Sequence, residues 1–299
     1  MKTEQALKAL VQEKYSQIAQ QEKGVNMSSC CGAGNCSTEV YNIMSDDYSH
    51  IQGYAESADL GLGCGLPTQF ACIQKGDTVI DLGSGAGNDC FVARAETGET
   101  GKVIGVDFTP AMIERARNNA ASLGFNNVEF REGDIENLPI GSNQANVVVS
   151  NCVLNLVPNK HAVLAEIFRV LKPGGHFSIS DIVLVGALPA ALRQDAEMYA
   201  GCVSGAIQKQ VYLELIHANG FQQVSVQKEK AIYLPDDILN KYLDEEALAQ
   251  FRAGDTGIFS ITVYGEKPQD APTAHPNTVP GVEQADTPVN ACQPGAGCC

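Results

Sequence analysis

The stretch VIDLGSGAGNDC, residues 79–90, decides the fold expected for this chain. An apolar run leads into three closely spaced glycines, and a helical pattern begins near Asn88. Glycines let the backbone approach a ligand and adopt positive φ, and the start of the following helix offers free N–H groups and the positive end of its dipole. Asp107 ends the next apolar run twenty residues after Gly87, where it would accept hydrogen bonds from ribose hydroxyls. The stretch therefore predicts a nucleotide-type binding loop between a strand and a helix.

Strand and helix patterns alternate around this loop. Strands are expected at 78–83, 102–107, 128–134, 145–151 and 176–184, and helices from residue 88 and at 110–124 and 159–172. The run at 145–151 is continuously apolar, which is typical of a parallel strand buried on both faces. The order predicts an α/β fold, a doubly wound, mostly parallel sheet with helices on both faces.

The flanking segments complete a four-part organisation. Helices are further expected at 3–20, 45–59, 189–202, 210–220 and 236–252, and strands at 221–232 and 258–268. We expect an N-terminal helical cap with a Cys-rich loop (1–75), a cofactor-binding core (76–188) and a C-terminal α+β segment that completes the sheet and the substrate site (189–266). The remaining residues, 267–299, are rich in Pro, Ala and Thr with few large apolar groups, and we expect them to be disordered and to end in cysteines.

The net charge of −15 argues against nucleic acid or an anionic membrane as a partner, because neither would find a basic surface. The sequence contains no run of about eighteen apolar residues, so no membrane span is expected. The N-terminus is charged and amphipathic, without the apolar centre of a signal peptide. We therefore expect a cytoplasmic protein, and a monomer.

The eleven cysteines are an odd number, so they cannot all pair within the chain, and cytosolic thiols are normally reduced. Their use as ligands or redox groups is therefore the more informative hypothesis. Three have distinctive neighbours: Cys64 in GLGCGLP, Cys152 in SNCVLNLVP and Cys202 in YAGCVSGA. Cys152 follows the fourth expected strand, at the sheet edge where open α/β sheets bind ligands. Cys72 and Cys90 lie beside apolar residues, and we expect both to be buried packing residues.

The cofactor loop favours S-adenosylmethionine over a dinucleotide. Asp81 stands two residues before the first glycine, where it would face a cationic amine and repel a pyrophosphate. VIDLGSGAGNDC, GVDFTPAMIERAR, EGDIENLP and VLKPGG together resemble the ordered motifs of class I S-adenosylmethionine-dependent methyltransferases, with their seven-stranded Rossmann-like sheet. The segments GLGCG, SNCVLNLVP and GCVSGA in addition resemble the arsenite methyltransferase family, particularly its bacterial members.

This resemblance implies an enzyme that methylates arsenite, or its thiol conjugates, for detoxification. It implies that Cys64, Cys152 and Cys202 are the catalytic thiolates that hold As(III), with a disulfide between Cys64 and Cys152 during turnover. A thiol reductant such as thioredoxin or glutathione would restore these thiols. The cofactor would be held by Asp81, Gly83, Ser84, Gly85, Gly87, Asp107, Met112, Asp134, Ile135 and Asn151.

Two other functions remain open at this point. A methyltransferase for a quinone- or sterol-like substrate would need a large apolar pocket and would have no use for Cys152 and Cys202. A thiol-rich protein could instead sequester metalloids without turnover. Zinc would prefer four ligands, and no CxxC pair supports such a site. Further cysteines are candidates for metalloid capture: Cys30, Cys31, Cys36, Cys292, Cys298 and Cys299.

Overall fold

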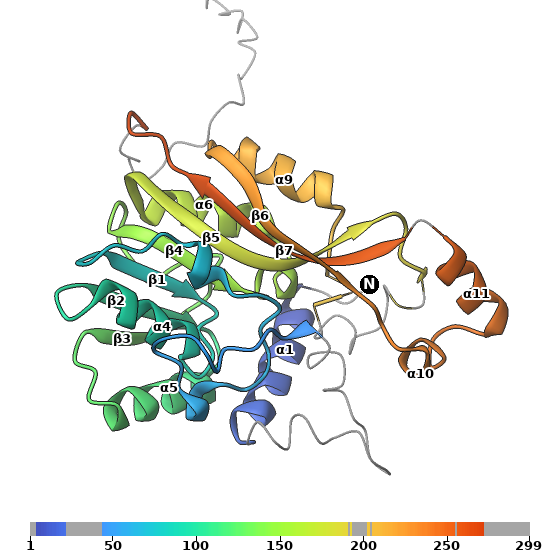
Figure 1. Ribbon diagram of the computed structural model, residues 1–299, viewed down its shortest axis with the longest axis horizontal. Helices are drawn as coiled ribbons and strands as arrows, with labels where there is room; N and C mark the ends of the chain where they lie inside the picture. Colours follow the sequence, from blue (N-terminus) through green and yellow to red (C-terminus); the bar gives the residue numbers. More distant parts are fainter. Residues whose placement is uncertain are drawn as a thin grey trace, which may run out of the picture.

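The computed structural model describes residues 4–21, 44–190, 192, 202–203, 205–254 and 256–271. This part of the chain is built around one seven-stranded sheet of order β3-β2-β1-β4-β5-β7-β6 (Figure 1). The strands are β1 (Thr78–Leu82), β2 (Lys102–Asp107), β3 (Val128–Glu132), β4 (Ala145–Asn151), β5 (Leu171–Val185), β6 (Gln222–Ile232) and β7 (Gly257–Glu266). The first five are parallel, and β7 is antiparallel to both of its neighbours. The predicted doubly wound, mostly parallel sheet is confirmed.

Helices cover both faces because the central strands are apolar on both sides. Val147 and Val149 of β4 join the core under α4 (Asn88–Thr97) and α5 (Pro110–Ser122), whereas Val148 joins the opposite core. That second core lies under α6 (Lys160–Val170) and α9 (Lys209–Ala218). A strand buried on both faces has no polar alternation, as the sequence pattern of this segment predicts.

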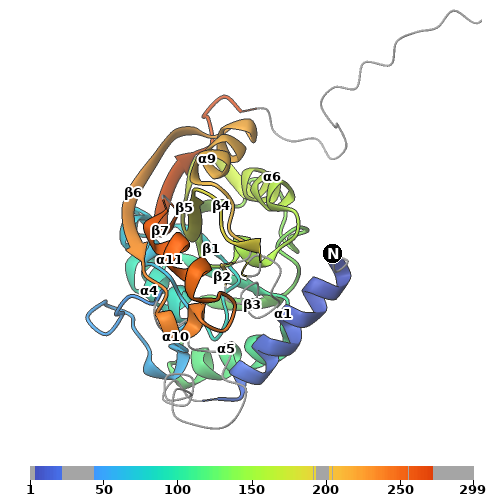
Figure 2. The same cartoon turned by 90° about the vertical axis from the view of Figure 1, so that its right-hand side faces the viewer.

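The N-terminal helix α1 (Glu4–Ala19) lies beside α5, at the carboxyl end of the parallel strands (Figure 2). Arg115 of α5 holds its end, donating hydrogen bonds to the carbonyls of Ala19, at 2.8 Å, and Gln21, at 2.6 Å. Gln12 of α1 donates to the carbonyl of Phe108, which follows β2. The helix is therefore fixed against the edge of the sheet where a ligand is expected.

The helix predicted at 45–59 does not form. Only the short 3₁₀ turn η1 (Glu56–Ala58) is present there. The Asp47 carboxylate accepts the backbone N–H of Ser49, a local bond that competes with helix formation. Gly53 has φ +92°, and a Cβ at this position would lie 2.6 Å from the carbonyl oxygen of Phe91. Packing against α4 therefore decides the path of this segment.

Smaller differences concern the C-terminal segment. The helix predicted at 236–252 is two helices, α10 (Asp236–Leu239) and α11 (Glu245–Ala253), because Asp244 caps the second through the N–H of Ala247. Strand β5 begins five residues before the predicted start at 176. β6 and β7 belong to the same sheet as β1–β5, and the boundaries between the four predicted parts of the chain stay a prediction.

Some predictions fall outside the described residues. They concern most of the helix at 189–202, the tail beyond residue 271, and the cysteines at 30, 31, 36, 292, 298 and 299. In the described part of the chain, no helix has the length and apolarity needed to cross a membrane.

Candidate active site

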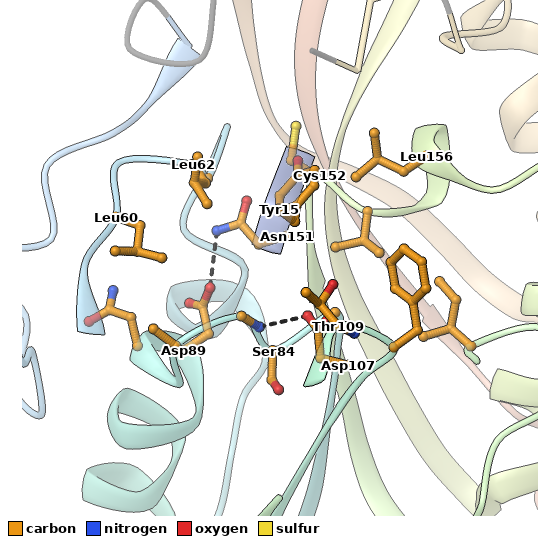
Figure 3. A pocket seen from close by; sticks show the side chains of 18 of the residues that line it. Tyr15, Leu60, Leu62, Ser84, Asp89, Asp107, Thr109, Asn151, Cys152 and Leu156 are labelled. Atoms are coloured by element: carbon orange, nitrogen blue, oxygen red, sulfur yellow. Dashed lines mark hydrogen bonds between the residues drawn. The ribbon is translucent and has the colours of Figure 1, made fainter. Parts of the chain in front are cut away.

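A pocket lies at the carboxyl ends of the central parallel strands (Figure 3). The glycine loop after β1 lines it, the ends of β2 and β4 supply Asp107 and Asn151, and Cys152 follows β4 directly. Lys8 and Tyr15 of α1 line another side. The pocket is thus assembled from the sheet edge predicted to bind a ligand and from the N-terminal helix.

The glycine loop keeps its shape through backbone bonds to the end of β2. Gly83 and Ser84 both donate to the carbonyl of Val106, at 2.8 and 3.0 Å. Gly85 donates its N–H to Asp107 Oδ2 at 3.0 Å, and Asp107 Oδ1 accepts the N–H of Thr109 at 2.8 Å. Burial raises the pKa of Asp107, and these backbone bonds oppose that rise. One carboxylate therefore holds the loop and lines the pocket at the same time.

Gly83→Ala is expected to lower the free energy of unfolding by roughly 2–4 kcal/mol. Gly83 has φ +67°, a conformation costing an L-residue about 1–2 kcal/mol. Its Cβ would also lie 2.4 Å from Val153 Cγ2, and overpacking typically costs about 1–3 kcal/mol. Urea unfolding would measure the change. The matched control is Gly85→Ala, with φ +51° but open space around a Cβ, so it should lose only the conformational part. Equal losses in the two variants would contradict the steric argument.

Two buried side-chain oxygens in the pocket lining, Ser84 Oγ and Asn88 Oδ1, have no hydrogen-bond partner among the residues that the structure describes. Buried polar atoms in native proteins are nearly always paired, so these oxygens mark where a polar ligand would contribute donors. The ribose hydroxyls and the amino-acid group of S-adenosylmethionine offer such donors, and the residues present therefore fit this cofactor.

Seven of the ten predicted cofactor residues line this pocket: Gly83, Ser84, Gly85, Asp107, Asp134, Ile135 and Asn151. Asp134 carries an ion pair with Lys8 of α1, at 2.6 Å. Lys8 also pairs with Glu136. Because this cation comes from the N-terminal helix, the environment of Asp134 was not visible in the motif that contains it.

The other three predicted cofactor residues, Asp81, Gly87 and Met112, are not in the pocket lining, and their contacts with the cofactor stay a prediction. Asp81 is buried on β1, where its Oδ2 accepts a hydrogen bond from the Cys90 thiol at 3.2 Å. The Cys90 side chain of α4 thus covers the carboxylate of Asp81, which was expected to face the amine of the cofactor. Gly87 is the N-cap of α4 and is closed in by Phe91 and Phe130. Met112 is fully buried in the core under α5.

An acid that the sequence reasoning missed takes a place in the pocket. Asp89, in the first turn of α4, lines it and accepts hydrogen bonds from the Tyr48 hydroxyl at 2.9 Å and from Asn151 Nδ2 at 3.1 Å; Figure 3 shows the second of these bonds. Burial raises the pKa of Asp89 to about 6, against the lowering effect of these hydrogen bonds. Its place in the first helical turn after the glycine loop was the signal that could have revealed it.

Binding of a cationic ligand in this pocket is expected to weaken as the pH falls through about 6. The pKa of Asp89 is about 6, so its carboxylate is ionised above that value and protonated below it. We expect the affinity for S-adenosylmethionine to fall by about tenfold from about pH 7 to about pH 5. Titration calorimetry across this range would measure it. Asp89→Asn should show weaker, nearly pH-independent binding, and a similar pH dependence in that variant would assign the effect to another group.

The three distinctive cysteines lie together in one buried cluster at the end of the sheet. The Cys202 thiol donates to the carbonyl oxygen of Cys152 at 3.0 Å. Hydrogen bonds from the Cys152 thiol to Cys202 and Cys64, together with burial, hold the pKa of Cys152 well above its usual value. Burial likewise raises the pKa of the Cys64 thiol. The raised pKa values keep the Cys64 and Cys152 thiols neutral in the free protein.

Only Cys152 of the three is part of the pocket lining; Cys64 and Cys202 are buried behind it. Cys152 and Cys202 have φ of 62° and 65°, a left-handed conformation that is uncommon for residues with a side chain and often marks functional sites. Among the described residues, no three His, Cys, Asp or Glu side chains form a ready metal-ligand set. The thiols are neighbours, and a shared ligand would have to draw their sulfur atoms together.

The other two described cysteines differ from each other. Cys90 is fully buried in the core, as predicted, and its thiol also bonds Asp81. Cys72 was expected to be buried and is exposed. It has φ +48° in the turn after η2 (Pro67–Phe70), and its side chain is exposed although Ala71 and Ile73 on either side are buried. Apolar neighbours in the sequence therefore did not predict burial of Cys72.

The sheet order, with β7 antiparallel, and the ligand-competent glycine loop define a class I S-adenosylmethionine-dependent methyltransferase. A profile described as a methyltransferase domain matches residues 73–220. An arsenite methyltransferase of Aquipseudomonas alcaligenes is 33% identical over 258 residues, which cover 84% of this chain and 71% of that protein. The chain belongs to the arsenite methyltransferase family.

Other members support this assignment. An arsenite methyltransferase of Halobacterium salinarum is 42% identical over 230 residues, which cover 73% of this chain. The chain spans 58% of the length of that relative. The crystal structure of an arsenic(III) S-adenosylmethionine methyltransferase from Chlamydomonas reinhardtii matches with a TM-score of 0.60 and 31% identity, covering 80% of this chain and 76% of that one.

Proposed function

We propose that this protein transfers a methyl group from S-adenosylmethionine to As(III) held by the thiolates of Cys64, Cys152 and Cys202. The observation that carries the proposal is the buried thiol cluster, because one member, Cys152, lines the cofactor pocket. Soft thiolates select soft acceptors such as As(III). The names of the relatives support arsenite as the substrate.

Neutral thiols suit the capture of an uncharged arsenic species. Three S–H groups and As(OH)₃ give three As–S bonds and three water molecules, each thiol proton leaving on a hydroxyl. With a thiol conjugate, three free thiols leave instead. No net charge enters the buried cluster in either case, which avoids the cost of burying an unpaired ion. The raised pKa of Cys152 is therefore compatible with its proposed role.

S-adenosylmethionine supplies an electrophilic methyl group when it is bound. Asp107 would hold the ribose hydroxyls, and Asp89 places a negative charge in the lining for a cationic group. Thiolate-bound As(III) keeps a lone pair, so no side chain has to act as a general base. The contribution of the protein is to position the two reactants, which alone can account for a large part of a rate enhancement.

The remaining features of the function are part of the same proposal. Methylation formally oxidises As(III) to As(V), and its return requires two electrons. Two of the three thiols, Cys64 and Cys152, would provide them by forming a disulfide. A reductant of the thioredoxin or glutathione class would then restore both thiols. We propose that the protein works in this way as a cytoplasmic monomer.

The direct test is to incubate the purified full chain with arsenite, S-adenosylmethionine and glutathione or thioredoxin, and to separate the arsenic species. Methylated arsenic that depends on both the protein and the cofactor is expected. Bound cofactor without any methylated arsenic would contradict the proposal. Methylation of a quinone offered in a parallel reaction, with arsenite unchanged, would favour the organic-substrate alternative.

A further inference from the structure

The side chain of Asn151, the last residue of β4, holds the backbone on both sides of the Cys64 side chain. Its Oδ1 accepts the N–H of Cys64 at 3.0 Å, and its Nδ2 donates to the carbonyl of Gly65 at 2.9 Å. The two segments are 87 residues apart in the sequence. One amide group thus forms a two-point clamp on the loop that carries Cys64.

The orientation of this amide is fixed from its other side. Asn151 Nδ2 lies 3.1 Å from Asp89 Oδ2 and 2.5 Å from the Tyr48 hydroxyl (Figure 3 shows the first of these contacts). The Tyr48 hydroxyl in turn donates to Asp89 and lies 3.1 Å from the carbonyl of Gly65. An amide nitrogen that carries only donors must face these acceptors, so the amide oxygen must face the N–H of Cys64.

The Cys64 and Cys152 backbones are held by different strands of the sheet. Cys152 is fixed to the sheet, because its N–H donates to the carbonyl of Ser180 on β5 at 2.7 Å. The Cys64 loop crosses from the cap, and its carbonyl accepts the Ser260 hydroxyl of β7 at 2.5 Å. Asn151 is joined directly to Cys152 in the chain and by a hydrogen bond to Cys64. It therefore links the two backbones directly.

We propose that Asn151, oriented by Asp89 and Tyr48, is a positioning residue that holds the Cys64 thiol against the Cys152 thiol. This goes beyond the cofactor contact expected for Asn151 and deepens the proposed function, on which its catalytic meaning rests. The placement itself is a property of the protein without substrate or cofactor. It can therefore be tested even if the proposed activity is absent.

Gly63 provides a second, independent way to disturb the clamp. A Cβ at this position would lie 2.6 Å from Asn151 Nδ2 and 3.1 Å from its Cγ. The φ of Gly63 is not in the left-handed region, so alanine adds this contact without backbone strain. Gly63→Ala should therefore displace the amide while leaving its chemistry intact.

The test measures how readily Cys64 and Cys152 form a disulfide. Full-length variants in a Cys202→Ser background are equilibrated with glutathione and its disulfide, where two protein thiols and one glutathione disulfide give one protein disulfide and two glutathione. Alkylation, digestion and mass spectrometry then quantify the Cys64–Cys152 peptide pair. We expect the equilibrium constant to fall at least tenfold in Asn151→Ala, and to fall also in Gly63→Ala.

The matched control is Asn127→Ala, which also removes two hydrogen bonds to backbone carbonyls, those of Gly98 and Gly101. Asn127 directly precedes β3, so it lies at the opposite end of the parallel strands from Cys64. Asn127→Ala should lower the melting temperature without changing the disulfide constant, as a purely structural role would. Constants within twofold of the parent in both folded test variants would overturn the proposal. If Asn151→Ala does not fold, the disulfide constant of Gly63→Ala decides the test. Arsenite and S-adenosylmethionine are absent from the assay, so a failure of arsenite methylation is a separate result.

Discussion

Cys152→Ser is expected to reduce arsenite methylation at least about 100-fold while leaving the affinity for S-adenosylmethionine within about threefold. Serine replaces a soft sulfur with a hard oxygen at the one thiol that lines the cofactor pocket, and oxygen is a poor ligand for As(III). The substitution removes one bond to the arsenic, so the substrate is no longer held in position relative to the cofactor. Arsenic speciation over time measures the first quantity, and calorimetry measures the second.

Cys72→Ser is the matched control for this prediction. It makes the same chemical change at an exposed cysteine outside the pocket lining, and it should leave both quantities unchanged. A Cys152→Ser protein that retains more than about a tenth of the activity would remove Cys152 from the substrate site. Loss of activity together with cofactor binding would point instead to a damaged pocket.

The sequence was most informative where local pattern and tertiary environment agree. The apolar run at Ala145–Asn151 forms β4 with the predicted bounds, because a central parallel strand needs little beyond continuous hydrophobicity. The glycine loop and Asp107 were found by their order and spacing, which follow from the geometry of one strand–helix–strand unit. The gathering of Cys64, Cys152 and Cys202 in one cluster required the family resemblance, since their spacing alone does not bring them together.

Contacts between distant segments could not be read from the sequence. Asp81 has a motif position that favours a ligand, yet Cys90 on the next helix covers its carboxylate. Asp89 is part of the same motif, and its role depends on Tyr48 and Asn151, which are 103 residues apart. Polar networks of this kind are set by how helices and loops pack on the sheet, which no local periodicity encodes.

The second large effect is expected from Asp107→Ala, which should weaken binding of S-adenosylmethionine by roughly 100-fold. A hydrogen bond to a charged group contributes about 1.5–3 kcal/mol, and about 1.4 kcal/mol corresponds to a tenfold change in affinity. Asp107 accepts the N–H groups of Gly85 and Thr109, so its loss removes the expected ribose contact and releases the loop beneath the ligand. Titration calorimetry measures the affinity, and a melting curve verifies that the variant is folded.

Asp77→Ala separates this effect from the general loss of an aspartate in a turn. Asp77 also accepts a backbone N–H, that of Gln74 at 2.8 Å, but it lies at the other end of β1 and outside the pocket lining. Asp77→Ala should lower the free energy of unfolding slightly and leave the affinity for S-adenosylmethionine unchanged. Asp107→Asn should fall between the two, because its amide keeps one acceptor oxygen but loses the charge. If folded Asp107→Ala binds S-adenosylmethionine within threefold of the wild type, the ribose is held elsewhere, and Ser84 and Asn88, whose side-chain oxygens have no partner among the described residues, become the next residues to test.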